Sequence, residues 1–402
     1  MPEPHPRLAI LGSGPVGLEA ALAAAEQGWP FTVYEAGSRP AAHVRAWGHV
    51  RLFTPWSLNV SARMARHLRA AGVAVPDGDE CPTGDELCDR VLDPLAALPE
   101  VAPSLRTDAR VVSVGRRGLL KHEEIATAER GAQPFRLLVA HGDGREEVAH
   151  ADVVFDCTGT YGQPNCTGDG GIPAAGESGL DDRIRRTLPD IDAEASEWAG
   201  QTVLLVGAGH SAQTAAAHLA MFARRHPGTE VVWVVRSPEP TWDEVPDDSL
   251  PGRAALVARS RELAGGEEPA IRLERGVVVE ALAERDGRVA VTLRDGTTSE
   301  VVVDRVLSLT GSVGDASIYR QLQVHECYAT AAPINLSAAL LGAAGGDCLQ
   351  QESHGVDVLR NPEPNFFILG AKSYGRVNQF LMRIGWEQVD EVFGALVAAK
   401  AA

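Results

Sequence analysis

The stretch ILGSGPVGLEA, residues 10–20, has the residue types and the spacing that bind a phosphate group. It continues an apolar run and places Gly12, Gly14 and Gly17 in a Gly-x-Gly-x-x-Gly pattern. In a strand–turn–helix unit the first glycine makes the tight turn, the second lets a pyrophosphate approach, and the third packs helix on strand. The helix N-terminus attracts phosphate, because its first N–H groups are unpaired and its dipole is positive there. Glu35 ends the next apolar run, where a carboxylate binds the ribose hydroxyls of a dinucleotide.

A second turn of the same kind occurs in LVGAGHSAQTA, where Gly207, Gly209 and Ala212 form Gly-x-Gly-x-x-Ala. The residues that follow its second strand differ from those of the first turn. Arg236 and Ser237 stand where the first unit has an acid. An acid would repel a 2′-phosphate, whereas a guanidinium and a hydroxyl would bind it. The second turn is therefore predicted to prefer NADPH over NADH.

Two dinucleotide sites in one chain indicate a division of roles between two cofactors. One cofactor stays bound and the other delivers electrons to it. A resident FAD and a visiting NADPH would need two separate pyrophosphate sites, which is what the two glycine turns supply.

The segments around each turn predict the elements that position it. Residues 7–12 and 31–35 are short apolar strands on either side of a helix over 15–27. Residues 110–150 contain three short strands separated by Gly/Asp turns, as in an antiparallel meander. The order of elements then repeats from residue 201, with a second meander before a strand that ends in Thr-Gly. A helix is also predicted over 82–98, with Thr83 as N-cap and Glu86 completing a capping box.

The predicted fold class is therefore α/β, with two Rossmann-like domains, each a βαβ unit plus a β-meander, in a glutathione-reductase-like arrangement. We expect a discontinuous FAD-binding domain over 1–198 and 318–402, and an inserted NADPH-binding domain over 199–317. The Gly/Pro-rich stretch from about 160 to 199 is expected to be a functional loop or a crossover.

Composition narrows the classes of partner. The chain has 402 residues, 45% of them hydrophobic, and a formal net charge of -17. There is no basic cluster for nucleic acid or an anionic membrane, and no apolar run of membrane-spanning length. The six cysteines contain no C-x-x-C pair and no zinc spacing, so no metal site is expected. We expect a cytoplasmic protein acting on a small-molecule substrate and dioxygen, with a homodimer left open.

With these motifs in view, the chain resembles the two-dinucleotide-binding-domain flavoproteins. Within them it is most similar to the flavin-containing, N-hydroxylating and Baeyer–Villiger-type monooxygenases. DVVFDCTGTYGQP resembles the family's alanine-threonine-glycine strand, with Cys157 in place of alanine, and NFFILGAKSYG stands where the family has its last flavin-contacting turn. The Baeyer–Villiger signature before the second turn is missing. Ala371 and Lys372 follow the last glycine in place of the usual aspartate, which puts the usual ribitol contact in doubt.

The resemblance implies a set of contact residues for each cofactor. Those expected for FAD are Gly12, Ser13, Gly14, Pro15, Gly17, Glu35, Thr158, Gly159 and Gly370. Those expected for NADPH are Gly207, Gly209, His210, Ser211, Ala212, Arg236 and Ser237. Side chains expected near the flavin ring are Trp47, Arg51, Trp56, Asn59, Asn378 and Cys348.

The resemblance also implies an activity. In such monooxygenases NADPH reduces the flavin, dioxygen forms a C4a-(hydro)peroxide, and one oxygen passes to a small N- or S-containing metabolite. Two alternatives stay open at this stage. One is an NADPH-dependent reductase or oxidase, including thiol-disulfide chemistry at Cys348 or Cys157. The other is a flavin-binding sensor without turnover.

Overall fold

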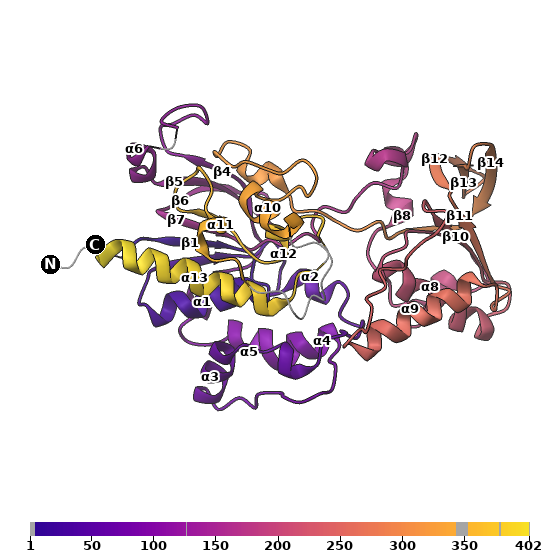
Figure 1. Cartoon of the computed structure of the whole chain (residues 1–402), viewed down its shortest axis with the longest axis horizontal. Coiled ribbons are helices and arrows are strands. Elements are labelled where there is room, and N and C mark those ends of the chain that lie inside the picture. The colour runs from indigo at the N-terminus through magenta and orange to yellow at the C-terminus, as the bar shows by residue number, and fades with distance from the viewer. Residues whose placement is uncertain (1–4, 126, 343–352, 378, 402) are drawn as a thin grey trace. The chain divides into compact units, whose positions relative to one another are not determined.

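The fold is described from a computed structural model, which describes residues 5–125, 127–342, 353–377 and 379–401. The chain forms two compact units. The first combines Met1–Gln163 with Val313–Ala402, and the second is Pro164–Ser312 (Figure 1). The division falls earlier than the predicted boundaries at 198/199 and 317/318. The reason is that the segment after Gln163 pairs with the second unit, through strand β8 (Ile184–Arg185) and through isolated bridges to β12 (Val278–Arg285).

The first unit is built on a parallel five-stranded sheet with the strand order β16-β7-β1-β2-β3. Its strands are β1 (Leu8–Leu11), β2 (Phe31–Tyr34), β3 (Leu105–Arg106), β7 (Val153–Asp156) and β16 (Phe366–Ile368). All neighbouring strands run parallel. Every residue of β1 and β7 is buried, which explains why β1 and the first three residues of β7 are apolar without alternation.

The two faces of this sheet are covered differently. Leu8 and Ile10 belong to a core that includes residues of α1 (Pro15–Glu26) and α13 (Met382–Ala401), which lie side by side (Figure 1). The alternate residues of β1, Ala9 and Leu11, belong to a second core on the opposite face of the sheet, beneath an antiparallel meander. The meander strands are β4 (Ala109–Arg116), β5 (Phe135–His141) and β6 (Glu146–Ala151). The sheet is therefore the middle of three layers.

Short helices complete the first unit. They are α2 (Ala42–Arg45), α3 (Ala62–Ala70), α4 (Gly84–Leu87), α5 (Asp93–Ala96), α6 (Ala128–Ala132), α10 (Ile334–Gly342), α11 (Val356–Leu359) and α12 (Ala371–Tyr374). The helical region predicted over 82–98 is α4 and α5 joined by a π-helical turn, Cys88–Leu92. The predicted capping box is confirmed: Thr83 Oγ1 accepts from the Glu86 N–H at 3.2 Å, and Glu86 Oε2 accepts from the Thr83 N–H at 2.7 Å.

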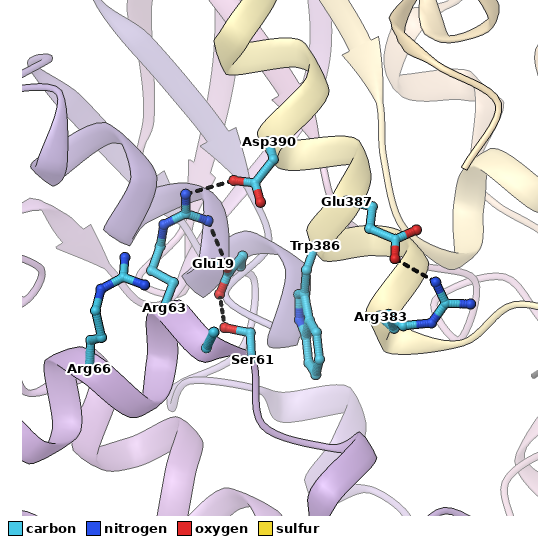
Figure 2. Close-up of a pocket in the computed structure, with 9 residues that line it drawn as sticks. Glu19, Ser61, Arg63, Arg66, Arg383, Trp386, Glu387 and Asp390 are labelled. Atoms are coloured by element: carbon cyan, nitrogen blue, oxygen red, sulfur yellow. Dashed lines mark hydrogen bonds and ion pairs between the residues drawn. The ribbon is translucent and has the colours of Figure 1, made fainter. Parts of the chain in front are cut away.

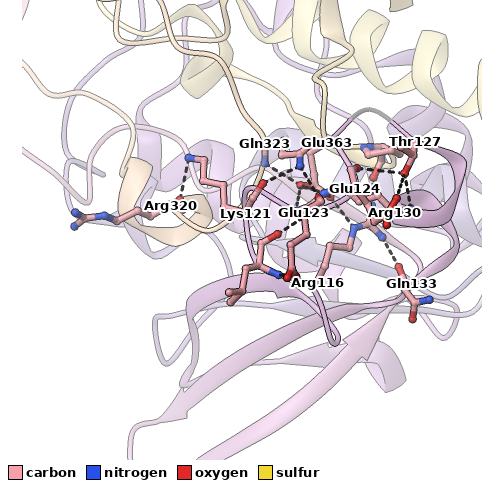
Figure 3. A network of polar contacts seen from close by, with 12 residues as sticks. Arg116, Lys121, Glu123, Glu124, Thr127, Arg130, Gln133, Arg320, Gln323 and Glu363 are labelled. Atoms are coloured by element: carbon pink, nitrogen blue, oxygen red, sulfur yellow. Dashed lines mark hydrogen bonds and ion pairs between the residues drawn. The ribbon is translucent and has the colours of Figure 1, made fainter.

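A buried ionic network joins the meander to the C-terminal part of the first unit. The carboxylate of Glu363 accepts from Arg116 Nε at 2.7 Å and from Arg130 Nη2 at 2.8 Å, and all three side chains are fully buried (Figure 3). The Gln323 N–H donates to the same carboxylate at 2.8 Å. Backbone carbonyls, such as that of Gln133, accept the remaining guanidinium N–H groups. The network satisfies the buried charges, as burial of ions requires.

The second unit repeats the plan. Its parallel sheet has the order β11-β10-β9-β15-β8, with β9 (Thr202–Val206), β10 (Glu230–Val235), β11 (Ile271–Arg275) and β15 (Arg305–Ser308). Its helices are α7 (Ala195–Trp198), α8 (His210–Arg225) and α9 (Pro251–Ala264). Strand β12 forms an antiparallel meander with β13 (Arg288–Arg294) and β14 (Thr298–Val303). No helix in the described part of the chain is both long and apolar enough to cross a membrane.

Candidate dinucleotide-binding sites

The first glycine turn connects β1 to α1, and two of its three glycines are required by packing. Gly12 has φ +93°, and a Cβ there would lie 2.8 Å from the carbonyl oxygen of Cys157. A Cβ on Gly17 would overlap the carbonyl oxygen of Gly12. These two glycines therefore perform the turn and helix-packing roles that the sequence predicted for them.

Gly14 is different, because neither its backbone nor its surroundings require glycine. It is the N-cap of α1 at φ −72° and ψ −174°, which is extended backbone open to any residue. A Cβ there would meet no atom within 4 Å. The first turn of α1 contains no acidic residue. This open face at a helix N-terminus fits a pyrophosphate that approaches the backbone more closely than a side chain would allow.

Glu35 lies against this turn, as its place after β2 predicts. Its Oε2 accepts from the Ser13 N–H at 3.0 Å and from Ser13 Oγ at 2.7 Å. Its Oε1 accepts from the Gly37 N–H at 2.8 Å, and the residue is 6% exposed. A carboxylate has about four acceptor positions, so one remains for a hydroxyl of a ribose. The structure thus brings together the first glycine turn and the carboxylate that the sequence predicts to bind a ribose.

Thr158 and Gly159 follow β7, and an ion pair that the sequence did not predict holds this segment. Lys372 Nζ lies 2.6 Å from Asp156 Oδ2, and both side chains are almost fully buried. The ammonium also donates to Thr158 Oγ1 at 3.1 Å and to the carbonyl oxygen of Asp315 at 2.8 Å. The lysine that follows the last glycine motif thus anchors the strand end and does not replace the missing aspartate.

Gly370 begins the turn that was assigned to the last flavin contact. It has φ +74°, and its N–H donates to Gln388 Oε1 of α13 at 2.8 Å. A Cβ there would lie 3.2 Å from a methyl group of Val16 in α1. Gly370 therefore brings this turn against the first turn of α1, next to the open face of Gly14.

The second glycine turn connects β9 to α8. Gly207 has φ +130°, and a Cβ there would overlap the carbonyl oxygen of Leu309. The indole N–H of Trp233, in β10, donates to the Gly207 carbonyl at 2.8 Å. Ala212 is fully buried, as its helix-packing role predicts. Gln213 Nε2 donates to the Ala208 carbonyl at 2.9 Å, so side chains from two elements fix the turn.

The remaining residues predicted to bind NADPH either follow strand β10 or begin helix α8. Arg236 directly follows β10 and is exposed, and no hydrogen bond or ion pair is recorded for its side chain in the described chain. Ser237 Oγ accepts from the Glu239 N–H at 3.2 Å. His210 and Ser211 begin α8, and burial lowers the pKa of His210. An exposed guanidinium beside a hydroxyl fits the 2′-phosphate of NADPH.

The described side chains that were expected near the flavin ring make contacts with different parts of the first unit. Trp47 packs near Tyr161, with ring centres 6.1 Å apart, and its indole nitrogen is buried without a recorded partner. Trp56 is 2% exposed beneath Arg90. Asn378 and Cys348 lie outside the described residues.

The other two of these side chains bond to the protein backbone. The guanidinium of Arg51 donates to the carbonyl oxygen of Cys81. Both ends of the Asn59 amide bond to Thr54, at 2.8 Å and 2.7 Å, which closes the loop between them.

The described cysteines form no disulfide. Burial raises the pKa of Cys157, and burial raises that of Cys88 to about 12. Cys327 differs, because hydrogen bonds from the Thr330 N–H and hydroxyl lower its pKa, although the residue is only 5% exposed. Sequence reasoning gave Cys327 no catalytic role, since nothing in the order of residues shows that its loop turns N–H groups toward the sulfur. No group of His, Cys, Asp or Glu side chains in the described ranges is arranged to hold a metal ion.

A surface pocket between α1, α3 and α13 is lined by charged side chains, most of which form ion pairs. Arg63 lies between Glu19 and Asp390, at 2.5 Å and 2.6 Å, with Trp386 across the pocket (Figure 2). Burial raises the pKa of Glu19, against the effects of its hydrogen bonds. The other lining arginines are also ion-paired, to Glu26 and to Glu387. We assign this pocket to the packing of the three helices.

The fold and these two turns define a class: α/β proteins with two dinucleotide-binding units. The sequence profile of the pyridine nucleotide-disulphide oxidoreductases matches residues 6–327, and the chain belongs to that family. Membership confirms the predicted flavoprotein resemblance, the fold class, and FAD and NADPH as the cofactors. The protein is an FAD-dependent oxidoreductase. A search of curated protein sequences finds no match.

Solved structures share the fold over the full chain at low identity. The bacillithiol disulfide reductase of Bacillus cereus has a TM-score of 0.69 at 18% identity, covering 98% of this chain and 99% of that one. The cadaverine monooxygenase of Erwinia amylovora, solved with FAD, has 0.64 at 12%, covering 97% and 94%. The ornithine hydroxylase of Pseudomonas aeruginosa has 0.61 at 16%, covering 97% and 98%. The similar folds thus include both reductases and monooxygenases.

Proposed function

We propose that the protein is an NADPH-dependent flavin monooxygenase that oxygenates a small nitrogen- or sulfur-containing metabolite. The observation that carries the proposal is the pair of glycine turns, one beside a buried carboxylate and the other beside an exposed guanidinium. Bound FAD would accept hydride from NADPH and pass electrons to dioxygen. The protein's part would be to bind and orient the two cofactors and to exclude water.

In this proposal the first unit, 1–163 with 313–402, holds FAD. Gly14 leaves room for the pyrophosphate, and Glu35 accepts from a ribose hydroxyl. The second unit holds NADPH, with Gly209 at the pyrophosphate and Arg236 and Ser237 at the 2′-phosphate. Among the side chains expected near the flavin ring, Trp47 is the best candidate for a contact with FAD. Its indole N–H is buried without a recorded partner and can donate to a ligand.

The environment of Cys157 favours oxygen transfer over disulfide reduction at this thiol. A thiol enzyme needs an accessible thiolate, and the nucleophile is activated by a lowered pKa. Burial has the opposite effect on Cys157, which we therefore do not assign to catalysis. Disulfide reduction is the second candidate because of Cys327: hydrogen bonds from Thr330 lower its pKa, although the residue, at 5% exposure, is buried like Cys157.

One set of assays separates the two functions. Purified protein should contain FAD, and NADPH should bleach it without air. In air, NADPH consumption should rise with an amine such as cadaverine or ornithine, and the amine should gain one oxygen. Stimulation by bacillithiol disulfide, lost in Cys327→Ser, would instead establish the reductase.

The cofactor assignment has its own test in Arg236→Ala. Loss of a charged hydrogen bond costs about 1.5–3 kcal/mol, so the Kd for NADPH should rise roughly 10- to 150-fold. The Kd for NADH should stay unchanged, because NADH has no 2′-phosphate. An equal loss for both would refute the assignment of Arg236. Arg272→Ala, an exposed arginine in β11, is the control.

A further inference from the structure

The two glycine turns differ at the second glycine, the position that a pyrophosphate approaches. At Gly14 a Cβ would meet no atom within 4 Å. At Gly209 a Cβ would lie 3.9 Å from Oδ2 of Asp243, the one atom within that distance. Both residues have nearly the same extended backbone, φ −72° with ψ −174° and 173°. The first turn is thus open, whereas a carboxylate stands on the phosphate-facing side of the second.

Asp243 comes from the loop between β10 and α9, and the loop is held by contacts within the second unit. Trp242 is 5% exposed and packs on Trp233, with ring centres 4.9 Å apart. Its carbonyl oxygen accepts from Gln213 Nε2 at 3.0 Å. Trp233 and Gln213 are the residues that also hold the glycine turn. The position of Asp243 relative to Gly209 is therefore fixed by side chains shared between loop and turn.

The loop also has an unusual backbone. Trp242 has φ +59° and Asp243 has φ +54°, a left-handed conformation that is rare for a bulky residue such as Trp242. Further along the loop, Glu244 pairs with Arg261 of α9, and Asp248 pairs with Arg253 at 2.7 Å. A strained conformation held by surrounding contacts is typical of functional sites. Here it directs an acid to the N-terminus of α8.

The chemistry of this position is that of a phosphate substitute. A negative charge is favourable at a helix N-terminus, so the carboxylate stabilises the turn when no dinucleotide is bound. A pyrophosphate would bring like charge to the same place. The charge of Asp243 also acts on His210, the first residue of α8, whose pKa it raises against the larger lowering by burial. The two observations place the carboxylate at the same end of the helix.

We propose that Asp243 is an affinity-determining residue of the second site: its carboxylate occupies the pyrophosphate position at Gly209 and must turn away when NADPH binds. This inference rests on the proposed function, because it takes the second turn as the NADPH site. Competition between the carboxylate and the pyrophosphate lowers the affinity for both NADPH and NADP⁺, and the lower affinity favours release of NADP⁺ after each turnover.

The test compares Asp243→Asn with Asp247→Asn in the full, FAD-loaded protein by calorimetric titration. Asp247 lies in the same loop, is exposed and also has positive φ, so its variant removes the same charge elsewhere. NADPH and ADP should each bind about 3- to 30-fold more tightly to Asp243→Asn and unchanged to the control. ADP is the key probe, since it has the pyrophosphate but neither the 2′-phosphate nor the nicotinamide.

The outcomes are distinct. Equal affinities of the two variants for ADP would overturn the proposal, and so would weaker binding to Asp243→Asn, which would make the carboxylate a ligand contact. The preference for NADPH over NADH is tested separately with Arg236→Ala. A failure of that test does not affect the ADP measurement, because ADP has no 2′-phosphate. If neither wild type nor Asp243→Asn binds any of these nucleotides beyond the bound FAD, the proposed function fails along with this inference.

Discussion

Substitution of Gly14 by alanine separates cofactor binding from folding at the first turn. The backbone of Gly14 suits alanine, and the added methyl group would meet no protein atom within 4 Å. Gly→Ala at such a position stabilises a fold by about 0.4–1 kcal/mol, because the unfolded chain loses conformational freedom. We therefore expect Gly14→Ala to fold with an unchanged or slightly raised unfolding temperature.

The same methyl group would project into the space where the pyrophosphate of FAD must lie. Pushing the phosphates outward breaks hydrogen bonds from backbone N–H groups, each worth about 1.5–3 kcal/mol with a charged acceptor. Loss of two such bonds costs about 3–6 kcal/mol, which is roughly 10²- to 10⁴-fold in Kd. The variant should be purified colourless, and FAD titration should show the weakened affinity.

Two matched variants make the result interpretable. Gly17→Ala should fail to fold, because its methyl group would overlap the Gly12 carbonyl. Gly115→Ala, in β4, has equal free space and should bind FAD normally. If Gly14→Ala keeps wild-type FAD affinity, the pyrophosphate does not pass over this glycine and the reasoning is wrong. Unfolding of Gly14→Ala would contradict the open face itself.

Three further predictions concern the ionic and thiol groups. Lys372→Met should lower the free energy of unfolding by about 3–5 kcal/mol in urea titrations, because Asp156 stays buried without its cation, and the double variant with Asp156→Asn should recover part of that loss. Glu26→Gln should be less stable than wild type at neutral pH: despite burial, hydrogen bonds from Arg63 and two neighbours lower the pKa of Glu26 to about 2. A carboxyl group whose pKa is lower in the folded than in the unfolded protein stabilises the fold at pH values above its unfolded pKa. The difference in unfolding free energy between Glu26→Gln and wild type should therefore shrink as the pH falls from about 4.5 to 2. A difference that stays constant over this range would contradict the assignment. Native Cys157 should resist iodoacetamide at pH 8 and react after unfolding, and rapid native labelling would show an accessible thiolate.

Features set by local sequence were predictable here. Gly12, Gly17 and Gly207 occupy the positions that their spacing indicates, since a strand–turn–helix unit is specified within about 30 residues. The capping box of Thr83 was predictable for the same reason. Their physical causes, a positive φ or a close backbone contact, involve neighbours in the motif or the adjoining strand.

Features that depend on distant contacts were not predictable. Lys372 and Asp156 are 216 positions apart, and neither neighbourhood indicates an ion pair. The position of Asp243 depends on packing against Trp233 and on the left-handed backbone of Trp242, neither of which the order of residues specifies. The division after Gln163 was not predictable for a similar reason, since the two-residue strand β8 is too short to be recognised in the sequence.

The discontinuity of the first unit has a consequence for synthesis on the ribosome. Strand β16 lies beside β7, and α13 packs on α1, so this unit cannot complete its sheet or its helical layer until β16 and α13 have been synthesised. The second unit contains all of its own strands within Pro164–Ser312. At ordinary translation rates it leads by on the order of 10 s. During that interval the meander can cover one face of the first sheet, but the apolar residues of α1 that pack against α13 stay exposed to solvent.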